Sequence, residues 1–430
     1  MRKSIVVSLL IISSLFAGEK YTLEECLDIA QKNNPDMMMS NQQLEISRNQ
    51  LSQAQGNFLP SLNSYVRTQR RSQGDSEYLY QGAKVTQEGA TSNYYEAGLS
   101  LNQPLFNSDI LSGYKLAKNG VTQAGVSKNQ TRQYLIYDVT EKFYTYLKAQ
   151  ELLNVYEKAH KNSLEQLKKT EEMQRLGQVA KKDVLKAKVK EGSDRLNIIN
   201  QQKALETSAI NLQAAMGIDP NDENFVVYEK IYEPVKGVTL TAAKEYSFEN
   251  NNDLKLLEEQ KKSAELQYQM AKSAYLPTLS ASFGYSRGGN QFDRIYSETD
   301  KWWNSSLTLS LGFSLFEGFK RKNEVQIKQI ESNIYDERIR KQKIQMTSNL
   351  DDLVRTLNTY KEMLEINQIN LNSAKEDLRL AQEMYKLNSA TFLEVLDAQA
   401  AHTRAESDII RIKYEMKITE AQLKLAMGTL

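Results

Sequence analysis

Few residue types in this chain of 430 residues could carry out chemistry. It has 2 histidines and 1 cysteine, and the two histidines, His160 and His402, lie far apart in helical stretches. This inventory argues against a zinc site. The adjacent glycines of "SRGGN" (286–290) follow a predicted strand with no helix after them, so we interpret that segment as a loop and not a phosphate cradle. We expect no metal, no cofactor and no enzymatic activity.

The informative polar side chains are two carboxylates in the segment "FLEVLDA". Glu394 and Asp397 are three residues apart, so both project from one face of a helix. On the wall of a pore, rings of such carboxylates attract cations, repel anions and can bind polyvalent cations. On an ordinary solvated helix they have no such role, and spacing alone leaves both interpretations open. The elements that position the two residues must decide between them.

The N-terminus predicts export. "MRKSIVVSLLIISSLFAG" has a basic start followed by an apolar run, Ile5 to Phe16, that is too short to span a bilayer. We therefore assign residues 1–17 to a signal peptide. No later segment approaches 18 apolar residues, so the mature chain has no predicted transmembrane helix. A formal net charge of +1 gives no reason to expect a nucleic-acid partner.

The chain contains two copies of one unit, because five blocks recur in the same order 210 to 217 residues later. The first repeat is 18–220, the second is 240–430, and an inter-repeat segment lies at 221–239. The recurring pairs are "LEECLDIAQKNNPDM" with "LTAAKEYSFENNNDL", "AQGNFLPSL" with "AKSAYLPTL", "LSLNQPLFN" with "LSLGFSLFE", "RLGQVAKKDVLKAK" with "KLNSATFLEVLDAQ", and "AAMG" with "LAMG".

Each repeat has the same predicted order of parts: helix, strand, polar loop, strand, very long helix, tight break and returning helix. The helices are expected at 23–56 and 240–274, the strands at about 60–69, 94–106, 277–286 and 305–316, the loops at 70–92 and 286–304, the long helices at about 108–174 and 318–386, and the returning helices at about 180–215 and 391–427.

The long helices carry a heptad seam. Apolar positions alternate at spacings of three and four from Leu350 to Tyr385, and the same pattern begins at Ile136 in the first repeat. A helix of about 67 residues is about 100 Å long, far longer than a globular domain is wide. Such helices must pack along their length against similar partners.

The strands have one apolar and one polar face. In "SSLTLSLGFSLFEGF" (305–319) apolar residues alternate with small or polar ones. This period of two residues is typical of a strand with one apolar face. Strands of about ten residues suit a tilted membrane crossing, and open strand edges are not tolerated in lipid. Four strands are too few to close, whereas three chains give twelve. The aromatic pairs at two strand starts suit a membrane interface: Tyr94 with Tyr95, and Trp302 with Trp303.

These features together resemble the TolC family of outer-membrane efflux and secretion channels. The resemblance covers essentially the whole mature sequence and is carried by the double repeat, "LPSL" and "LPTL", "NQPLF", "SLFEGF", "FLEVLDAQ" and the two "MG" pairs. It implies an α+β membrane protein with two internal repeats. In a homotrimer, a transmembrane β-barrel with four strands per chain and twelve per trimer would lie in outer-membrane lipid, above a long α-helical barrel in the periplasm.

The resemblance also implies roles for single residues. Glu394 and Asp397 match the family's paired acidic pore constriction, with Glu394 in place of the more usual Asp. Asp183 and Tyr385 match two positions of its polar gate bonds, but Ala390 replaces the basic third partner. The tips are candidate docking points for a periplasmic adaptor (membrane fusion) protein that is joined to an inner-membrane pump; their residues are Leu176, Gly177, Leu387 and Asn388.

Two functional hypotheses from different classes remain at this stage. The favoured one is a passive exit duct for a tripartite efflux pump or a type I secretion system, with cargo chosen by the pump. The alternative is a periplasmic coiled-coil adaptor or scaffold, which rarely has four amphipathic strands divided evenly between two repeats. A secreted enzyme is a distant third, since no nucleophile or metal set is present.

Overall fold

The computed structural model of the protein describes residues 20–220, 225–228, 240–387 and 389–430. The expected signal peptide at 1–17 lies outside them, as does most of the inter-repeat segment at 221–239. The chain divides into two compact units, and each unit contains parts of both repeats. The first unit comprises residues up to 41, 127–255 and 341–430, and the second comprises 42–126 and 256–340.

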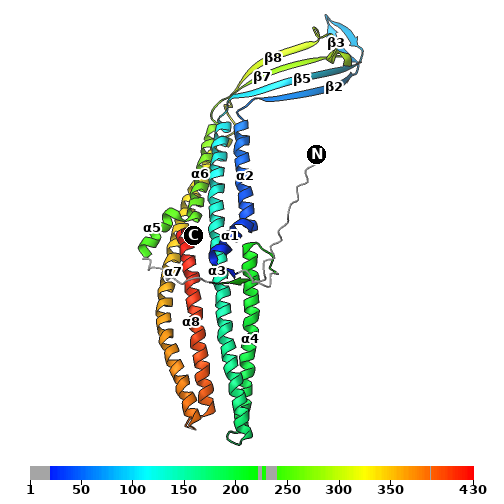
Figure 1. Cartoon of the computed structure of the whole chain (residues 1–430). Coiled ribbons are helices and arrows are strands. Elements are labelled where there is room, and N and C mark those ends of the chain that lie inside the picture. The colour runs from blue at the N-terminus through cyan, green and yellow to red at the C-terminus, as the bar shows by residue number, and fades with distance from the viewer. Residues whose placement is uncertain (1–19, 221–224, 229–239, 388) are drawn as a thin grey trace, which may run out of the picture. The chain divides into compact units, whose positions relative to one another are not determined.

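Two pairs of long antiparallel helices form most of the first unit (Figure 1). Their ends lie within two residues of the positions expected from the sequence, because the heptad pattern runs uninterrupted between two tight breaks. The bounds are Ser108–Arg175 for α3, Lys181–Met216 for α4, Lys320–Lys386 for α7 and Phe392–Met427 for α8. The first parts of α3 and α7 belong to the second unit.

Burial confirms the heptad seam on α7. From Lys361 to Leu387 every residue is exposed except the seven at seam positions. Those seven are Leu364, Asn367, Leu371, Ala374, Leu378, Ala381 and Tyr385. A stripe this narrow is typical of a helix that packs in a coiled coil.

The sequence predicts one helix at 23–56 and one at 240–274, and both predictions miss a break. Each segment forms two helices separated by a single asparagine, Asn34 in the first repeat and Asn251 in the second. The bounds are Leu23–Asn33 for α1, Pro35–Gly56 for α2, Leu240–Asn250 for α5 and Asn252–Ser273 for α6.

The side chain of each asparagine explains the break. The Asn34 side-chain oxygen accepts hydrogen bonds from the backbone N–H groups of Asp36 and Met37, and Asn251 does the same for the first turn of α6. An asparagine at this position satisfies N–H groups that have no partner within the helix. The amide nitrogen of Asn34 donates to the carbonyl of Ala215 at 2.9 Å, in the last turn of α4.

The returning helices end in the same way in both repeats. Gly217 and Gly428 follow α4 and α8 in the left-handed conformation, with φ of +70° and +76°. A Cβ atom would lie 2.6 Å from the Asn33 carbonyl oxygen at Gly217, and 2.5 Å from that of Asn250 at Gly428. The recurring "NN" and "MG" motifs of the sequence therefore meet in each repeat.

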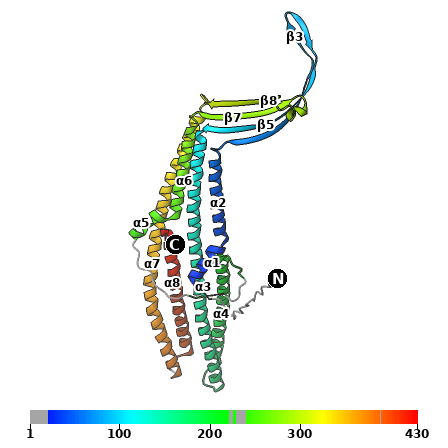
Figure 2. The same ribbon diagram turned by 45° about the horizontal axis from the view of Figure 1, so that its top comes forward.

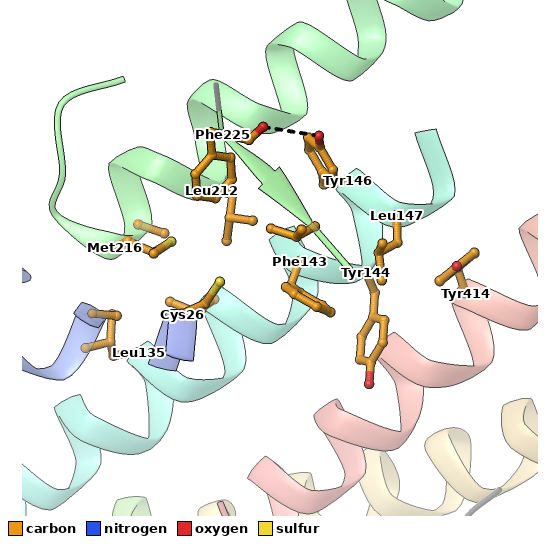
Figure 3. Close-up of a cluster of buried hydrophobic side chains, with 14 of the residues drawn as sticks. Cys26, Leu135, Phe143, Tyr144, Tyr146, Leu147, Leu212, Met216, Phe225 and Tyr414 are labelled. Carbon is orange, nitrogen blue, oxygen red and sulfur yellow. Dashed lines mark hydrogen bonds between the residues drawn. The ribbon is translucent and has the colours of Figure 1, made fainter. Parts of the chain in front are cut away.

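The main hydrophobic core of the first unit brings α1, α3, α4 and α8 together (Figure 3). Cys26 of α1 and Leu212 of α4 are fully buried in it, and Phe143 of α3 is nearly so. The Tyr146 hydroxyl donates to the Phe225 carbonyl at 3.4 Å, which joins Phe225 of the inter-repeat segment to α3. Next to Phe225, β6 (Val226–Val227) pairs in parallel with β1 (Lys20–Tyr21).

The second unit contains one antiparallel sheet of four strands in the order β2-β5-β7-β8 (Figures 1 and 2). Ser61 pairs with Asn102 in the first repeat, and their counterparts Thr278 and Gly312 pair in the second. The two hairpins therefore share one register. The strands are β2 at Ser61–Gln73, β5 at Ala90–Phe106, β7 at Thr278–Gly289 and β8 at Trp303–Gly312.

The predicted polar loops at 70–92 and 286–304 are corrected by the structure. In the first, β2 and β5 extend well into the segment, and β3 (Ser76–Tyr80) forms a separate hairpin with β4 (Ala83–Gln87). In the second, β7 includes most of "SRGGN", and a short 3-10 helix, η1 (Phe292–Ile295), follows. The β3 and β4 strands were missed because they pair only with each other and lack the alternation of apolar and polar residues that identifies a half-buried strand.

Candidate functional site

The two tips of the long helix pairs are exposed turns. Gly177 has a φ of +76°, and its N–H donates to the Gln174 carbonyl, which closes α3. Leu176 beside it is 67% exposed. At the other tip Leu387 is 75% exposed, while Asn388 lies outside the described residues. The tips therefore present apolar side chains that nothing within the described chain covers.

Glu394 has a local structural role that the sequence analysis did not predict. Its carboxylate accepts the backbone N–H of Thr391 at 2.8 Å, and the Thr391 hydroxyl accepts the backbone N–H of Glu394 at 3.3 Å. This reciprocal pair is a capping box that starts α8. The spacing Thr-x-x-Glu before an apolar run was the readable signal for it. Glu394 is exposed, so the cap leaves its charge in contact with solvent.

Asp397 lies one turn further along α8, beside a groove of about 610 Å³ between α4 and α8. The groove is lined mainly by apolar side chains, with Lys186 and Lys190 on the α4 side. Asp397 is exposed and lines this groove, whereas Glu394 does not. Both carboxylates are exposed on α8, and their role in a pore constriction stays a prediction. Of the two carboxylates, only Asp397 shares this groove with the basic side chains Lys186 and Lys190 of α4.

Asp183 and Tyr385, the residues predicted to form a gate, lie close enough to interact electrostatically but do not form a hydrogen bond. The Tyr385 hydroxyl is buried and has no hydrogen-bond partner among the described residues. Burial raises the pKa of this tyrosine, and the negative charge of Asp183 raises it further. A buried hydroxyl without a hydrogen-bond partner costs stability.

Tyr385 belongs to a compact apolar cluster that joins α7 to α8. Its ring centroid lies 5.7 Å from that of Phe392, and Ala381, Val395 and Ala398 pack around it. This cluster fixes the start of α8 against the end of α7. The positions of Glu394 and Asp397 therefore depend on the packing of residues immediately beside them.

The aromatic residues expected at a membrane interface meet at one end of the sheet. Tyr95 pairs with Gly289, and Trp303 pairs with Arg287, two residues earlier on β7. Tyr94 and Trp302 are exposed at the same strand ends. The register therefore places these four aromatic residues from two repeats at the same end of the sheet, and their position at a membrane interface stays a prediction.

Sequence reasoning missed the residue that organises the segment between β7 and β8. One guanidinium nitrogen of Arg287, Nη2, donates to the carbonyls of Ser297 at 2.5 Å and Glu298 at 2.8 Å. The Arg294 guanidinium stacks over the Trp302 ring at 4.0 Å from its centroid. Nothing in the motif "SRGGN" predicts this role, because the carbonyls it binds lie about ten residues later.

No metal centre is found in the part of the chain that the structure describes. Those residues contain no group of three His, Cys, Asp or Glu side chains that could hold an ion. His160 lies 2.9 Å from the Glu191 carboxylate, in the contact between α3 and α4. Among the described residues, no helix is both long enough and apolar enough to cross a membrane.

Known proteins resemble this chain along nearly its whole length. The family model described as outer membrane efflux protein matches residues 26–218 and 246–429. Outer membrane protein TolC of Escherichia coli is 23% identical, over 97% of this chain and 84% of that protein. The alkaline protease secretion protein AprF of Pseudomonas aeruginosa is 23% identical, over 94% of this chain and 83% of that protein.

Solved structures share the fold. The Campylobacter jejuni CmeC outer membrane channel superposes with a TM-score of 0.83, covering 95% of this chain and 85% of that one. The sequence identity is 17%, so this likeness concerns the fold alone. The repeated helix pairs and the four-stranded sheet are therefore an architecture that an outer membrane channel also adopts.

Proposed function

The chain belongs to the outer membrane efflux protein family, and from that premise we propose that three copies assemble into one channel. As a member of this family the protein is an outer-membrane exit duct of an efflux or secretion system, with its helical part in the periplasm. One observation carries the proposal of three copies: the sheet of each chain is open, with β2 at one edge and β8 at the other. An open edge in lipid leaves backbone groups without partners.

The faces of the edge strand support a lipid environment. On β8 the side chains of Leu307, Leu309 and Leu311 are all exposed, and serine and threonine alternate with them. Exposed leucines in such a row favour contact with hydrocarbon on one side and with water on the other. Twelve strands from three chains form a closed, even-numbered sheet in which no edge remains.

The duct conducts passively in this proposal. Its energy and its cargo selection come from an inner-membrane pump, which is joined to the duct by a periplasmic adaptor. The adaptor contacts the exposed tips at Leu176, Gly177, Leu387 and Asn388. Apolar side chains at an exposed turn suit the end of another helical hairpin, since the contact removes them from water.

Glu394 and Asp397 form the constriction in this proposal. Repetition of the two carboxylates in three chains gives two rings, and their negative charge favours cations. Asp183 and Tyr385 form the gate. Their closed state is a hydrogen bond that a small movement of the tips makes or breaks, in a two-state change driven by contact with the adaptor.

The first test is the mass of the detergent-extracted protein, measured by light scattering with the detergent subtracted. We expect a mass near three protomers, from a sample that is insoluble without detergent. A soluble monomer or dimer would leave the sheet unable to close. In that case the alternative function, a periplasmic scaffold, would replace the duct.

A further inference from the structure

The first unit contains a small polar pocket that the proposed duct does not use. Its volume is about 280 Å³, and side chains of α3, α6, α7 and α8 line it. All of these residues belong to the first unit of one chain. The pocket lies at the end of α8, whereas the proposed constriction lies at its start. From Asp397 to Gln422 the helix rises roughly 40 Å, so the pocket is separate from the constriction and the tips.

Four side-chain amides are the main polar groups of this pocket. Gln342, Gln345 and Asn349 come from α7, where spacings of three and four place them on one face, and Gln422 comes from α8. Among the described residues, none of the four amide groups has a hydrogen-bond partner. Gln342 and Gln422 are only partly exposed. Since each amide has two N–H donors and one acceptor oxygen, the pocket presents many unused hydrogen-bonding groups.

A carboxylate and a phenol form the opposite wall of the pocket. Asp253, in the first turn of α6, accepts hydrogen bonds from the Tyr134 hydroxyl at 3.1 Å and from Gln130 Nε2 at 2.5 Å. Burial and the nearby Asp253 charge raise the pKa of Tyr134 to about 12, so its hydroxyl stays neutral. The two donors of α3 hold the carboxylate in place. A carboxylate has about four lone-pair sites, so it can still accept from a ligand.

The pocket also has an apolar part. Met346 is buried, and Leu425 and Ala426 lie in the last turn of α8 beside the amide of Gln422. Small-molecule sites commonly combine apolar contact area with a few polar groups that fix orientation. A ligand that fits here therefore has hydroxyl or amide groups at its edges and C–H groups on a face.

The charges around the pocket argue against an ionic ligand. No lysine, arginine or histidine lines it, and Asp253 would repel an anion. A metal ion is also disfavoured, because the described residues contain no group of three His, Cys, Asp or Glu side chains that could hold one. The single carboxylate already accepts from two neutral donors. A neutral ligand that both donates and accepts hydrogen bonds suits these groups best.

We propose that this pocket binds a neutral, polyhydroxylated ligand the size of one sugar ring. Neighbouring hydroxyls of the ring pair with the side-chain amides, which donate and accept in one plane, and a further hydroxyl donates to Asp253. The C–H face of the ring covers Met346 and Leu425. Ligand pockets commonly have volumes of about 300 Å³ or more, so a pocket at this lower limit holds one ring. The site lies within one chain, so it does not depend on how many copies assemble.

The first repeat lacks an equivalent set of amides. The offset of 211 residues between the tip motifs places Thr131 at the position of Gln342 and Asp138 at that of Asn349. The Thr131 hydroxyl donates to the carbonyl four residues earlier, and Asp138 forms an ion pair with Lys142. These counterparts are used within α3. The free amides are therefore specific to the second repeat and are not a by-product of the duplication.

Binding is tested on the detergent-extracted, full-length protein by saturation-transfer difference NMR, with glucose and N-acetylglucosamine as probes. The double variant Gln342→Met with Gln422→Met keeps side-chain length and removes two amides. We expect it to lower the affinity for the bound sugar by roughly tenfold or more. The matched control is Gln368→Met, an exposed glutamine of α7 outside the pocket, which should bind like the unaltered protein.

Two further measurements keep the test decisive if the double variant folds poorly. Circular dichroism and the mass of the extracted protein report whether the variants keep the fold, as expected for glutamine to methionine changes in a helix. Asn349→Leu, at an exposed position, removes a third amide and should also weaken binding severalfold. The proposal is overturned if neither sugar binds the unaltered protein, or if the pocket variants bind as well as the Gln368→Met control.

Charged probes and a longer glycan define the ligand class. Choline and gluconate should bind more weakly than the neutral sugars, and a stronger signal from either ion would overturn the assignment. Chitotetraose distinguishes the two sources of a sugar ring. Binding at least as tight as that of N-acetylglucosamine supports a glycan chain, and binding of the single ring alone supports a free sugar. Failure of sugar binding would leave the mass near three protomers unchanged, so it is distinguishable from failure of the proposed assembly.

Discussion

At the residue scale, the structure separates the charge of Glu394 from its role as a cap. The side chain starts α8 by accepting the Thr391 N–H, so an alanine at this position would change the helix as well as the charge. Glutamine keeps the cap, because it completes the same box without a negative charge. The informative variants at the proposed constriction are therefore Glu394→Gln and Asp397→Asn.

The double variant Glu394→Gln with Asp397→Asn should reduce the cation-to-anion permeability ratio by roughly twofold or more, since both rings lose their charge. The ratio is read from reversal potentials in planar bilayers under a salt gradient. Asp377→Asn, an exposed carboxylate on α7, is the control and should have little effect. An unchanged ratio in the double variant, or an equal fall in the control, would exclude the constriction at these residues.

The two glycines that end α4 and α8 give a prediction on stability. Gly217→Ala and Gly428→Ala should each lower the free energy of unfolding by more than about 1 kcal/mol, because φ is positive and the new Cβ meets a backbone carbonyl. Gly192→Ala in the interior of α4, where space is open, should raise it by up to about 1 kcal/mol. Thermal unfolding followed by circular dichroism ranks the three variants.

At the element scale, the long helices were predictable and the short breaks were not. The seam from Leu364 to Tyr385 is a pattern repeated over many turns, so its burial follows from the sequence alone. Asn34 and Asn251 are single residues inside longer helical patterns, and the caps they form were missed although an asparagine before Pro35 is a typical start of a helix. The Glu394 cap could have been predicted from Thr391 three residues earlier, but Glu394 was interpreted only as part of a pore wall or of a solvated helix face.

The missing bond between Asp183 and Tyr385 shows the same limit within the site. The family resemblance implied a gate at these two residues, which stays a prediction, and in the structure Asp183 is close enough to act on Tyr385 electrostatically. Whether a hydrogen bond forms depends on the exact position of the Tyr385 hydroxyl, which the contacts of its ring with Phe392 and Val395 of α8 help to set. Packing of this kind depends on shapes, and the residue types alone do not fix it.

The hairpin of β3 and β4 gives the prediction for a single element. These strands pair only with each other among the described strands, and Lys84 forms an ion pair with Glu77 across them. Replacement of residues 76–87 by a short Gly-Ser linker should therefore leave the trimer mass and the single-channel conductance unchanged. A fall in trimer yield would show that the hairpin contributes to closure of the sheet.

At the scale of the whole molecule, the double repeat and the open sheet lead to the same conclusion. Each repeat supplies one hairpin to the sheet, and the outer strands β2 and β8 each pair on one side only among the described strands. An open strand edge is not tolerated in lipid, so a sheet of this kind in an outer-membrane channel needs further strands to close it. Further copies of the chain supply those strands in the proposed channel. The mass of the detergent-extracted protein is therefore the measurement on which the predictions at the proposed constriction depend, because two rings of carboxylates exist only if several copies surround one pore.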